Sequence, residues 1–239
     1  MGLPRFNAGR RSHHSIESSM QVHKIGILGG TGNEGGGLAA RLAHAGHSVT
    51  IGSRDEAKAR EAARQFALLR LNVEAGDNRL AAASSDIVIL TVPFQAQLTT
   101  LESVKSELQG KLLIDATVPL VPPKVSQVQL PPEGSAVVLA QRLLGENVRV
   151  VSAFQNVSAH HLRDLSHPVE CDVIVCGDDL AACETVVELV ESIRLRAYYS
   201  GPLCNSAAVE ALTSVLIAIN RRYKVSVSGV KLTGVRKAG

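Results

Sequence analysis

A glycine-rich segment near the amino terminus has the residue types and the spacing needed to hold a dinucleotide. Gly30, Gly32 and Gly35 form a GxGxxG pattern between a short apolar run, 25–28, and a helix-like segment, 38–45. In such a loop the first glycine allows a sharp turn, the second admits a pyrophosphate and the third lets the helix pack against the strand. The helix start adds unpaired N–H groups and partial positive charge. We therefore predict nucleotide binding here, the alternative being a purely structural turn.

The end of the next apolar run, 48–51, indicates which dinucleotide is bound. An NAD site usually has an acidic residue at this point to bind the ribose hydroxyl, but this sequence has Ser53 and Arg54. A hydroxyl and a guanidinium suit a 2′-phosphate, and Lys58, one helical turn after Arg54, can reach the same anion. Asp55 is expected to cap the following helix. The sequence therefore predicts NADP, the alternative being two solvated cations at a helix start.

Two further segments follow apolar runs at the edge where open α/β sheets bind ligands. Thr91, Pro93 and Phe94 close the run that begins at Ile87, and Phe94 is expected either against the coenzyme or in the core. Residues 116–119 occupy the matching place after the next run and are expected near a nicotinamide.

Histidines and cysteines are the other residues whose chemistry could matter. His160 and His161 are adjacent, and two neighbours rarely chelate one ion, so we predict a surface pair and no metal site. Cys171 and Cys176 lie five residues apart in a strand-like run, which points them to opposite faces. We expect reduced thiols and a cytoplasmic protein.

Composition narrows the classes of function. The 239 residues include 25 Lys and Arg against 22 Asp and Glu, a net charge of +3, and only 3% aromatic residues. Base-stacking surfaces are therefore not expected, and we predict no nucleic-acid partner. The apolar runs at 87–94 and 112–121 fall short of a bilayer span, which predicts no membrane association. An apolar helix, 207–219, makes a homodimer plausible.

The order of apolar runs and helical segments predicts an α/β fold, a Rossmann-type doubly wound parallel sheet with a small α/β C-terminal domain. We expect a disordered N-terminal tail at 1–21, an NADP-binding domain at 22–154 and a small C-terminal domain for a substrate or second coenzyme at 155–239. Run 149–154 is expected to be the last strand of the first sheet. The other expected strands are 87–92, 111–116, 171–176 and 196–199, and the expected helices are 55–69, 95–108, 135–144, 178–193 and 205–220.

With these residues identified, 22–234 resembles the coenzyme F420-dependent NADP oxidoreductase family, also described as NADPH-dependent F420 reductases. The resemblance is carried by ILGGTGNEG, IGSRD, LTVPF, VVSAFQNVSA, VIVCGDD and GPLCNS, of which the last three separate this family from other Rossmann dehydrogenases. It implies a deazaflavin bound in the cleft between a Rossmann domain and a small C-terminal domain. The implied function is hydride transfer between NADPH or NADP+ and coenzyme F420.

The resemblance also implies roles for individual residues. The implied pyrophosphate contacts are Thr31, Gly32, Asn33 and Glu34, the implied 2′-phosphate contacts are Ser53, Arg54 and Lys58, and the residues implied to flank the coenzyme are Phe94, Leu98 and Ala159. The residues implied over the hydride-transfer centre are Gln155, Asn156 and Val157. Those implied near the deazaflavin are Pro202, Leu203, Asn205 and, in a looser match, Ser228. Some family members carry His at the position of Gln155.

The implied chemistry asks for little acid or base, because nicotinamide and deazaflavin both carry hydride and proximity does most of the work. Gln155 and Asn156 would supply hydrogen bonds to the deazaflavin, the alternative being that they only cap a strand end. Two other functions remain open. The chain could reduce another acceptor, such as a flavin or a ferric chelate, or it could be a non-catalytic NADP sensor.

Overall fold

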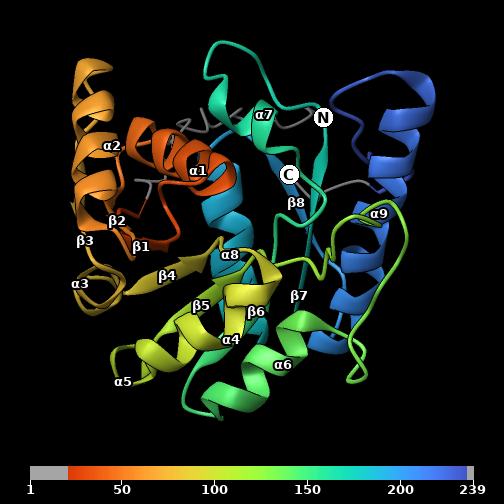
Figure 1. Ribbon diagram of the computed structural model, residues 1–239, viewed down its shortest axis with the longest axis horizontal. Coiled ribbons are helices and arrows are strands. Elements are labelled where there is room, and N and C mark those ends of the chain that lie inside the picture. Colours follow the sequence, from red (N-terminus) through yellow and green to blue (C-terminus); the bar gives the residue numbers. More distant parts are fainter. Residues whose placement is uncertain (1–20, 236–239) are drawn as a thin grey trace, which may run out of the picture.

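The computed structural model describes residues 21–235, and the predicted disordered tail lies outside them except for its last residue. Within this range, strands form one eight-stranded sheet in the order β3-β2-β1-β4-β5-β6-β7-β8 (Figure 1). The strands are β1 Lys24–Leu28, β2 Ser48–Gly52, β3 Val73–Gly76, β4 Ile87–Leu90, β5 Leu112–Asp115, β6 Arg149–Ser152, β7 Asp172–Gly177 and β8 Arg196–Tyr199.

Helices connect these strands and cover both faces of the sheet (Figure 1). They are α1 Asn33–His44, α2 Glu56–Leu68, α3 Asn78–Ala83, α4 Phe94–Ser103, α5 Lys105–Leu108, α6 Ala136–Leu144, α7 Ala159–Arg163, α8 Leu180–Ser192, the 3₁₀ turn η1 Leu203–Asn205 and α9 Ser206–Tyr223. The predicted cap is confirmed, because the Asp55 carboxylate accepts the Lys58 N–H. Asp179 caps α8 in the same way. Such caps contribute about 1 kcal/mol each.

The predicted α/β fold with a mostly parallel sheet is confirmed, and three local expectations are corrected. Residues 149–154 do not end the sheet, because β7 pairs with β6 and runs antiparallel to it. The expected helix 95–108 is divided at Val104 into α4 and α5. Strand β3 and helix α3 were not expected, since each is short and carries polar residues. The division into two domains at residue 154 stays a prediction.

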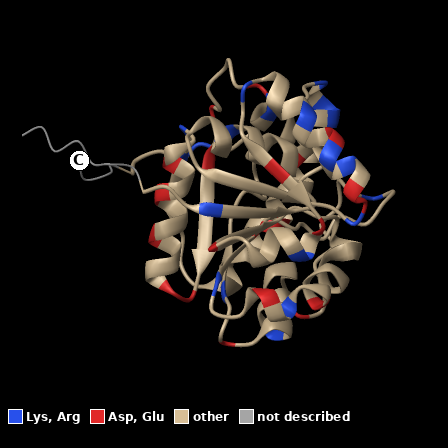
Figure 2. Ribbon diagram, turned by 90° about the vertical axis from the view of Figure 1, so that its left-hand side faces the viewer, with Lys and Arg blue, Asp and Glu red and all other residues tan. Residues whose placement is uncertain are grey.

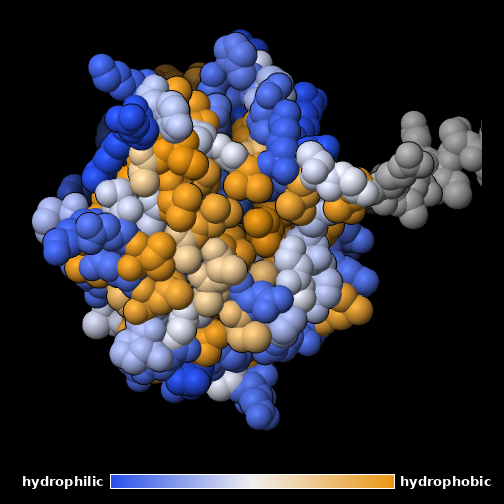
Figure 3. Space-filling view, turned by 90° about the vertical axis from the view of Figure 1, so that its right-hand side faces the viewer, coloured by the Kyte–Doolittle hydropathy of each residue, from blue (hydrophilic) through white to orange (hydrophobic). Residues whose placement is uncertain are grey.

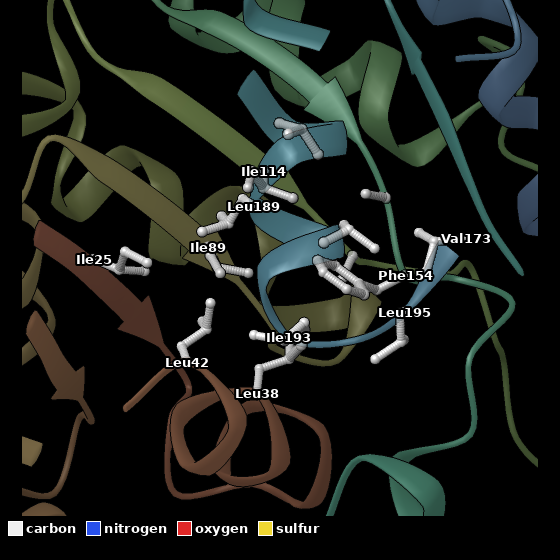
Figure 4. Close-up of a cluster of buried hydrophobic side chains, with 14 of the residues drawn as sticks. Ile25, Leu38, Leu42, Ile89, Ile114, Phe154, Val173, Leu189, Ile193 and Leu195 are labelled. Atoms are coloured by element: carbon white, nitrogen blue, oxygen red, sulfur yellow. The ribbon is translucent and has the colours of Figure 1, made fainter. Parts of the chain in front are cut away.

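The core lies on both faces of the sheet because successive strand residues point to opposite sides. On one face, Leu38 and Leu42 of α1 meet Leu189 and Ile193 of α8 over the strands, and Phe154 lies with them (Figure 4). On the other face a second cluster is built by α4, α5 and α6. The carboxy-terminal α8 therefore completes the core that α1 begins, and each fully buried side chain of this size contributes about 1.5–3 kcal/mol.

Helix α7 is held against α1 by one buried guanidinium. The Nε of Arg41 donates to the Leu162 carbonyl at 2.9 Å, and its Nη2 donates to the carbonyls of His161 at 2.8 Å and Asp164 at 2.6 Å. Gly37 allows this approach, since a Cβ there would lie 2.7 Å from the Leu162 Cβ. The segment that follows β6 is thereby fixed beside the glycine-rich loop.

Substitutions at Gly36 and Gly37, which are adjacent in α1, distinguish the effect of packing on stability from the effect of helix propensity. Gly37→Ala should be destabilising by about 1–2 kcal/mol, a fall in Tm of about 3–6 °C, because the added Cβ meets Leu162. Gly36→Ala is the matched control. Its Cβ would find only ordinary contacts, the nearest at 3.5 Å, so the helix propensity of Ala should raise stability by about 1 kcal/mol. Thermal melting of both variants checks this, and equal Tm values would contradict the packing account.

Candidate functional site

The three glycines of the loop meet different surroundings. A Cβ on Gly30 would lie 2.6 Å from the Ile51 Cβ, and one on Gly35 would lie 2.5 Å from the Thr91 Oγ1, so both positions are packed against the sheet. A Cβ on Gly32 would meet only the Gly29 carbonyl, at 3.3 Å. The middle glycine thus leaves open space over the start of α1, where unpaired N–H groups attract an anion.

A cavity of about 690 Å³ opens beside this loop at the carboxyl ends of β4, β5 and β6. Its walls come from segments far apart in the sequence, including Thr213 and Ile217 of α9. Phe94 is partly buried and lines this cavity, not the core. The predicted site residues that the structure brings together here are Gly32, Asn33, Glu34, Thr91, Pro93, Phe94, Gln155, Val157 and Ala159.

Gln155 is fixed in the cavity wall by two elements. Its Nε2 donates to the Asp115 carbonyl at 2.7 Å, and its own carbonyl accepts the Thr213 hydroxyl at 2.7 Å. Its Oε1 and the Thr117 Oγ1 are buried and have no partner among the described residues. A buried acceptor without a donor costs about 1–3 kcal/mol, so a ligand N–H group reaching either oxygen would be favoured.

Asn156 has a different position from its neighbour. Its Nδ2 donates to the Asp172 carbonyl at 2.7 Å and its Oδ1 accepts the Ile174 N–H at 3.4 Å, so the amide ties the turn after β6 to β7. It lines only a smaller pocket of about 130 Å³, together with Ser228. Ser228 is held there by Leu216, whose carbonyl accepts its hydroxyl at 3.2 Å. The side chain of Asn156 therefore supports the backbone of this turn.

Glu34 lines the cavity, and the carboxyl group of Asp115 is buried behind the cavity wall at the end of β5. Asp115 is fully buried, and its carboxylate accepts the Gln97 Nε2 at 2.7 Å and the Thr117 N–H at 2.8 Å. Burial raises the pKa of Glu34 to about 8, and the negative charge of Asp115 adds to this rise. The sequence placed Glu34 in the loop, but its altered acidity follows from contacts that only the fold creates.

The opposite side of Gly32 faces a groove of about 270 Å³ between α1 and α2, which is lined by Thr31 and by Arg163 of α7. No sequence pattern around Arg163 predicts its place in this groove, because the packing of α7 against α1 brings it there. The neighbouring turn holds Ser53, which is buried, and Arg54, which is exposed. None of the hydrogen bonds or ion pairs within residues 21–235 involves the Arg54 guanidinium.

Lys58 differs from Arg54 in having a partner. Its Nζ lies 3.8 Å from the Asp55 carboxylate, and both side chains are at least half exposed. An exposed pair of this kind contributes less than about 1 kcal/mol, so Lys58 can exchange Asp55 for a phosphate at small cost.

Like Asn156 and Ser228, four further residues that the resemblance implies near the coenzymes do not line the cavity of about 690 Å³. Leu98 is 40% exposed on α4 and does not line it. Leu203 is buried in the second core cluster, with its N–H donating to the Asp178 carboxylate. Pro202 and Asn205 are exposed beside it in the turn after β8. The reversed direction of β7 carries this turn away from the glycine-rich loop.

The remaining residues add no second reactive centre to the part of the chain that the structure describes. No group of three His, Cys, Asp or Glu residues is placed to hold a metal ion among residues 21–235. The ring centroids of His160 and His161 lie 6.4 Å apart. All four cysteines are free, and Cys204 alone is exposed. One described segment, Leu203–Tyr223, could cross a bilayer by length and composition, with 33% of it buried.

Comparisons with known proteins identify relatives of this chain. Residues 24–119 match the family described as NADP oxidoreductase, coenzyme F420-dependent. The F420-dependent NADP reductase of Methanocaldococcus jannaschii is 41% identical over 222 residues, covering 89% of this chain and 99% of that protein. The enzyme of the same name from Methanothermobacter thermautotrophicus is 43% identical over 226 residues, covering 90% of this chain and 97% of that protein.

A solved structure from Arthrobacter sp. FB24, provisionally titled an F420-dependent NADP-reductase, superposes with a TM-score of 0.73. It is 24% identical in sequence, and the match covers 85% of this chain and 96% of that one. At this identity the likeness shows the fold alone, and the family assignment rests on the two sequence relatives above.

The unpartnered Arg54 generates a test of the 2′-phosphate assignment. Arg54→Ala should weaken NADPH binding about ten- to a hundredfold, the loss of a charge-assisted hydrogen bond worth about 1.5–3 kcal/mol, and leave NADH binding unchanged. Arg60→Ala is the control, since Arg60 lies on α2 in an exposed pair with Glu56. Calorimetric titration of both nucleotides measures the effect, and an unchanged NADPH affinity would refute the assignment.

Proposed function

Because the chain belongs to the family of F420-dependent NADP reductases, we propose that it is an oxidoreductase that moves a hydride between NADP(H) and the deazaflavin coenzyme F420. The observation that carries the proposal is the cavity of about 690 Å³ that begins at the glycine-rich loop. Its walls are largely apolar, and they come from both the amino-terminal and the carboxy-terminal parts of the chain. Such a cavity suits two planar rings held face to face without water between them.

We propose distinct roles for the residues around this cavity. The backbone N–H groups at Gly32, Asn33 and Glu34 bind the pyrophosphate, because only Gly32 leaves the helix start uncovered. Val157 and Gln155 form the wall beside the reacting rings. The reaction itself transfers a hydride from the reduced deazaflavin to the nicotinamide, or the reverse, with one proton exchanged with solvent. The protein positions the two rings and excludes water from between them, and it forms no covalent bond to either coenzyme.

The Gln155 side chain is proposed to orient the second ring. One N–H of its Nε2 is donated to the Asp115 carbonyl, whereas its buried Oε1 has no partner among the described residues and can accept a hydrogen bond. The N–H groups of a deazaflavin pyrimidine edge or of a nicotinamide amide are suitable donors. This assigns Gln155 to positioning, which is consistent with chemistry that needs no strong acid at that point.

The cellular compartment and the partners of the protein are also part of the proposal. We propose a cytoplasmic protein that acts on small redox coenzymes without a nucleic acid or a membrane. Free cysteines are typical of a reducing compartment, and burial raises the pKa of Cys171, Cys176 and Cys183 to about 11, which keeps these thiols unreactive. Basic and acidic residues are interspersed over the elements in Figure 2, as expected of a surface without a nucleic-acid face.

We also propose a homodimer formed through α9. Its outward stripe contains Val215, Ile219 and Tyr223, spaced by four residues and 45%, 38% and 71% exposed. Hydrophobic side chains gather on this side of the molecule (Figure 3). An apolar face of this kind is buried most simply against its own copy across a two-fold axis.

Hydride transfer gives the direct test of function. Purified protein should oxidise NADPH with F420 as acceptor, and run the reverse reaction, without added flavin or metal. Val157→Trp should slow transfer at least about tenfold, because bulk at a buried position of the cavity separates the rings, while NADPH affinity stays near that of the wild type. Leu180→Trp adds the same bulk at an exposed position outside the cavity and should not change the rate.

Loss of deazaflavin absorbance is the measurement, with free flavin and ferric citrate as parallel acceptors. Turnover with either of those but none with F420 would replace the proposal by a general NADPH reductase. NADPH binding without turnover on any acceptor would instead indicate a sensor.

The molar mass in solution tests the proposed dimer. Light scattering coupled to gel filtration should give twice the 25.3 kDa chain mass for the wild type. Val215→Arg combined with Ile219→Arg should give a monomer, because two charges at the centre of an apolar interface cannot be buried without partners. A wild-type monomer at tens of micromolar would refute the interface.

A further inference from the structure

Glu34 is the one ionisable residue among the described residues that line the cavity of about 690 Å³. It lies in the first turn of α1, and the residue as a whole is partly buried. The other walls contribute apolar side chains, hydroxyls and amides. A charge on a ligand in this cavity therefore acts on Glu34 without another ionisable group of the described lining to counter it.

The neighbouring Asp115 decides where the proton of this pair resides. Asp115 accepts two hydrogen bonds from N–H groups, which stabilise its ionised form, whereas none of the hydrogen bonds among residues 21–235 involves the Glu34 carboxyl. Burial raises the pKa of both carboxyl groups, and the negative charge of Asp115 raises that of Glu34 further, so the two do not both ionise near neutral pH. The start of α1 favours an anion at Glu34, but the dipole is worth only about 0.3–1 kcal/mol at an exposed site and does not offset desolvation. The neutral acid is thus the state of Glu34 in the empty cavity.

We propose that Glu34 couples proton release to the charge of the bound nicotinamide, holding its proton beside the neutral ring of NADPH and losing it beside the cationic ring of NADP+. This inference rests on the proposed function, since it requires the nicotinamide in this cavity. The step balances as a simple dissociation: the carboxyl O–H bond breaks, the proton goes to solvent and the carboxylate remains against the positive ring. No electron moves at this stage.

The coupling between the ionisation of Glu34 and nucleotide binding has a definite direction. A nearby cation stabilises the carboxylate, so the pKa of Glu34 falls below its value of about 8 when NADP+ binds and stays high when NADPH binds. By reciprocity, ionised Glu34 favours NADP+ over NADPH. The ratio Kd(NADPH)/Kd(NADP+) therefore rises as pH increases through this range. A shift of about one pKa unit between the two complexes corresponds to a tenfold change in that ratio.

Other titrating groups do not produce the same effect. Asp115 faces Glu34 from β5, and Glu210 of α9 is buried with its carboxylate turned to the start of α6, where it accepts the Ala136 N–H at 2.8 Å. His160 and His161 lie on α7 and do not line the cavity. Both nucleotides carry the same phosphates, so the ratio of their dissociation constants cancels every contribution of the phosphate end. What remains is the difference in ring charge.

Calorimetry on the full chain tests the inference without turnover. NADP+ and NADPH are titrated separately at about pH 6.5 and about pH 9, below and above the pKa of Glu34, in buffers of different ionisation enthalpy that report protons released. The wild-type Kd ratio should rise about tenfold with pH, and NADP+ should release more protons than NADPH near pH 8. Glu34→Gln keeps the neutral shape and should remove both effects. Glu61→Gln, an exposed position on α2, should retain them.

The outcomes separate the inference from the function on which it rests. Failure of both nucleotides to bind at either pH would overturn the proposed function. Tight binding with a ratio that does not change with pH in the wild type would overturn the role of Glu34 alone. A ratio that changes equally in Glu34→Gln would place the coupling on another group and likewise overturn it.

Discussion

The buried carboxylate of Asp115 is the group on which the candidate site depends. Its side chain accepts hydrogen bonds from Gln97 of α4 and from the backbone after β5, and its carbonyl accepts the Gln155 amide from the turn after β6. Three segments are thus fixed to one residue at the carboxyl end of the central sheet. A buried carboxyl group without water around it holds its donors tightly, because leaving any of them unpaired costs free energy.

The walls of the cavity near Asp115 come together because the chain reverses direction after β6. Phe154 adopts a left-handed backbone with φ of 79°, and β7 then runs antiparallel to β6. The reversal returns the chain through α8 to the face of the sheet that α1 covers, and α9 closes the cavity with the Thr213 hydroxyl on the Gln155 carbonyl. Strain at a non-glycine residue of this kind costs about 1–3 kcal/mol and persists where packing determines it.

Electrostatic tuning of the site follows from the same arrangement. The start of α1 and Arg163 give positive charge to the groove at the glycine-rich loop, whereas Glu34 is the one ionisable residue among the described residues that line the cavity. The groove and the cavity on the two sides of Gly32 thus differ in charge. This contrast suits a dinucleotide, whose phosphates carry fixed charge and whose nicotinamide changes charge during reaction.

The sequence by itself determined the local parts of this protein. Glycine spacing predicts the loop, apolar runs predict most of the strands, and Asp55 predicts a helix start, because each depends on residues within a few positions of one another. Tertiary structure alone decided the pairing of β7 with β6, the approach of Arg163 to the loop, the retreat of Leu203 into the core and the acidity of Glu34. Those features depend on contacts between residues distant in sequence and on the water that packing excludes, and no local pattern carries that information.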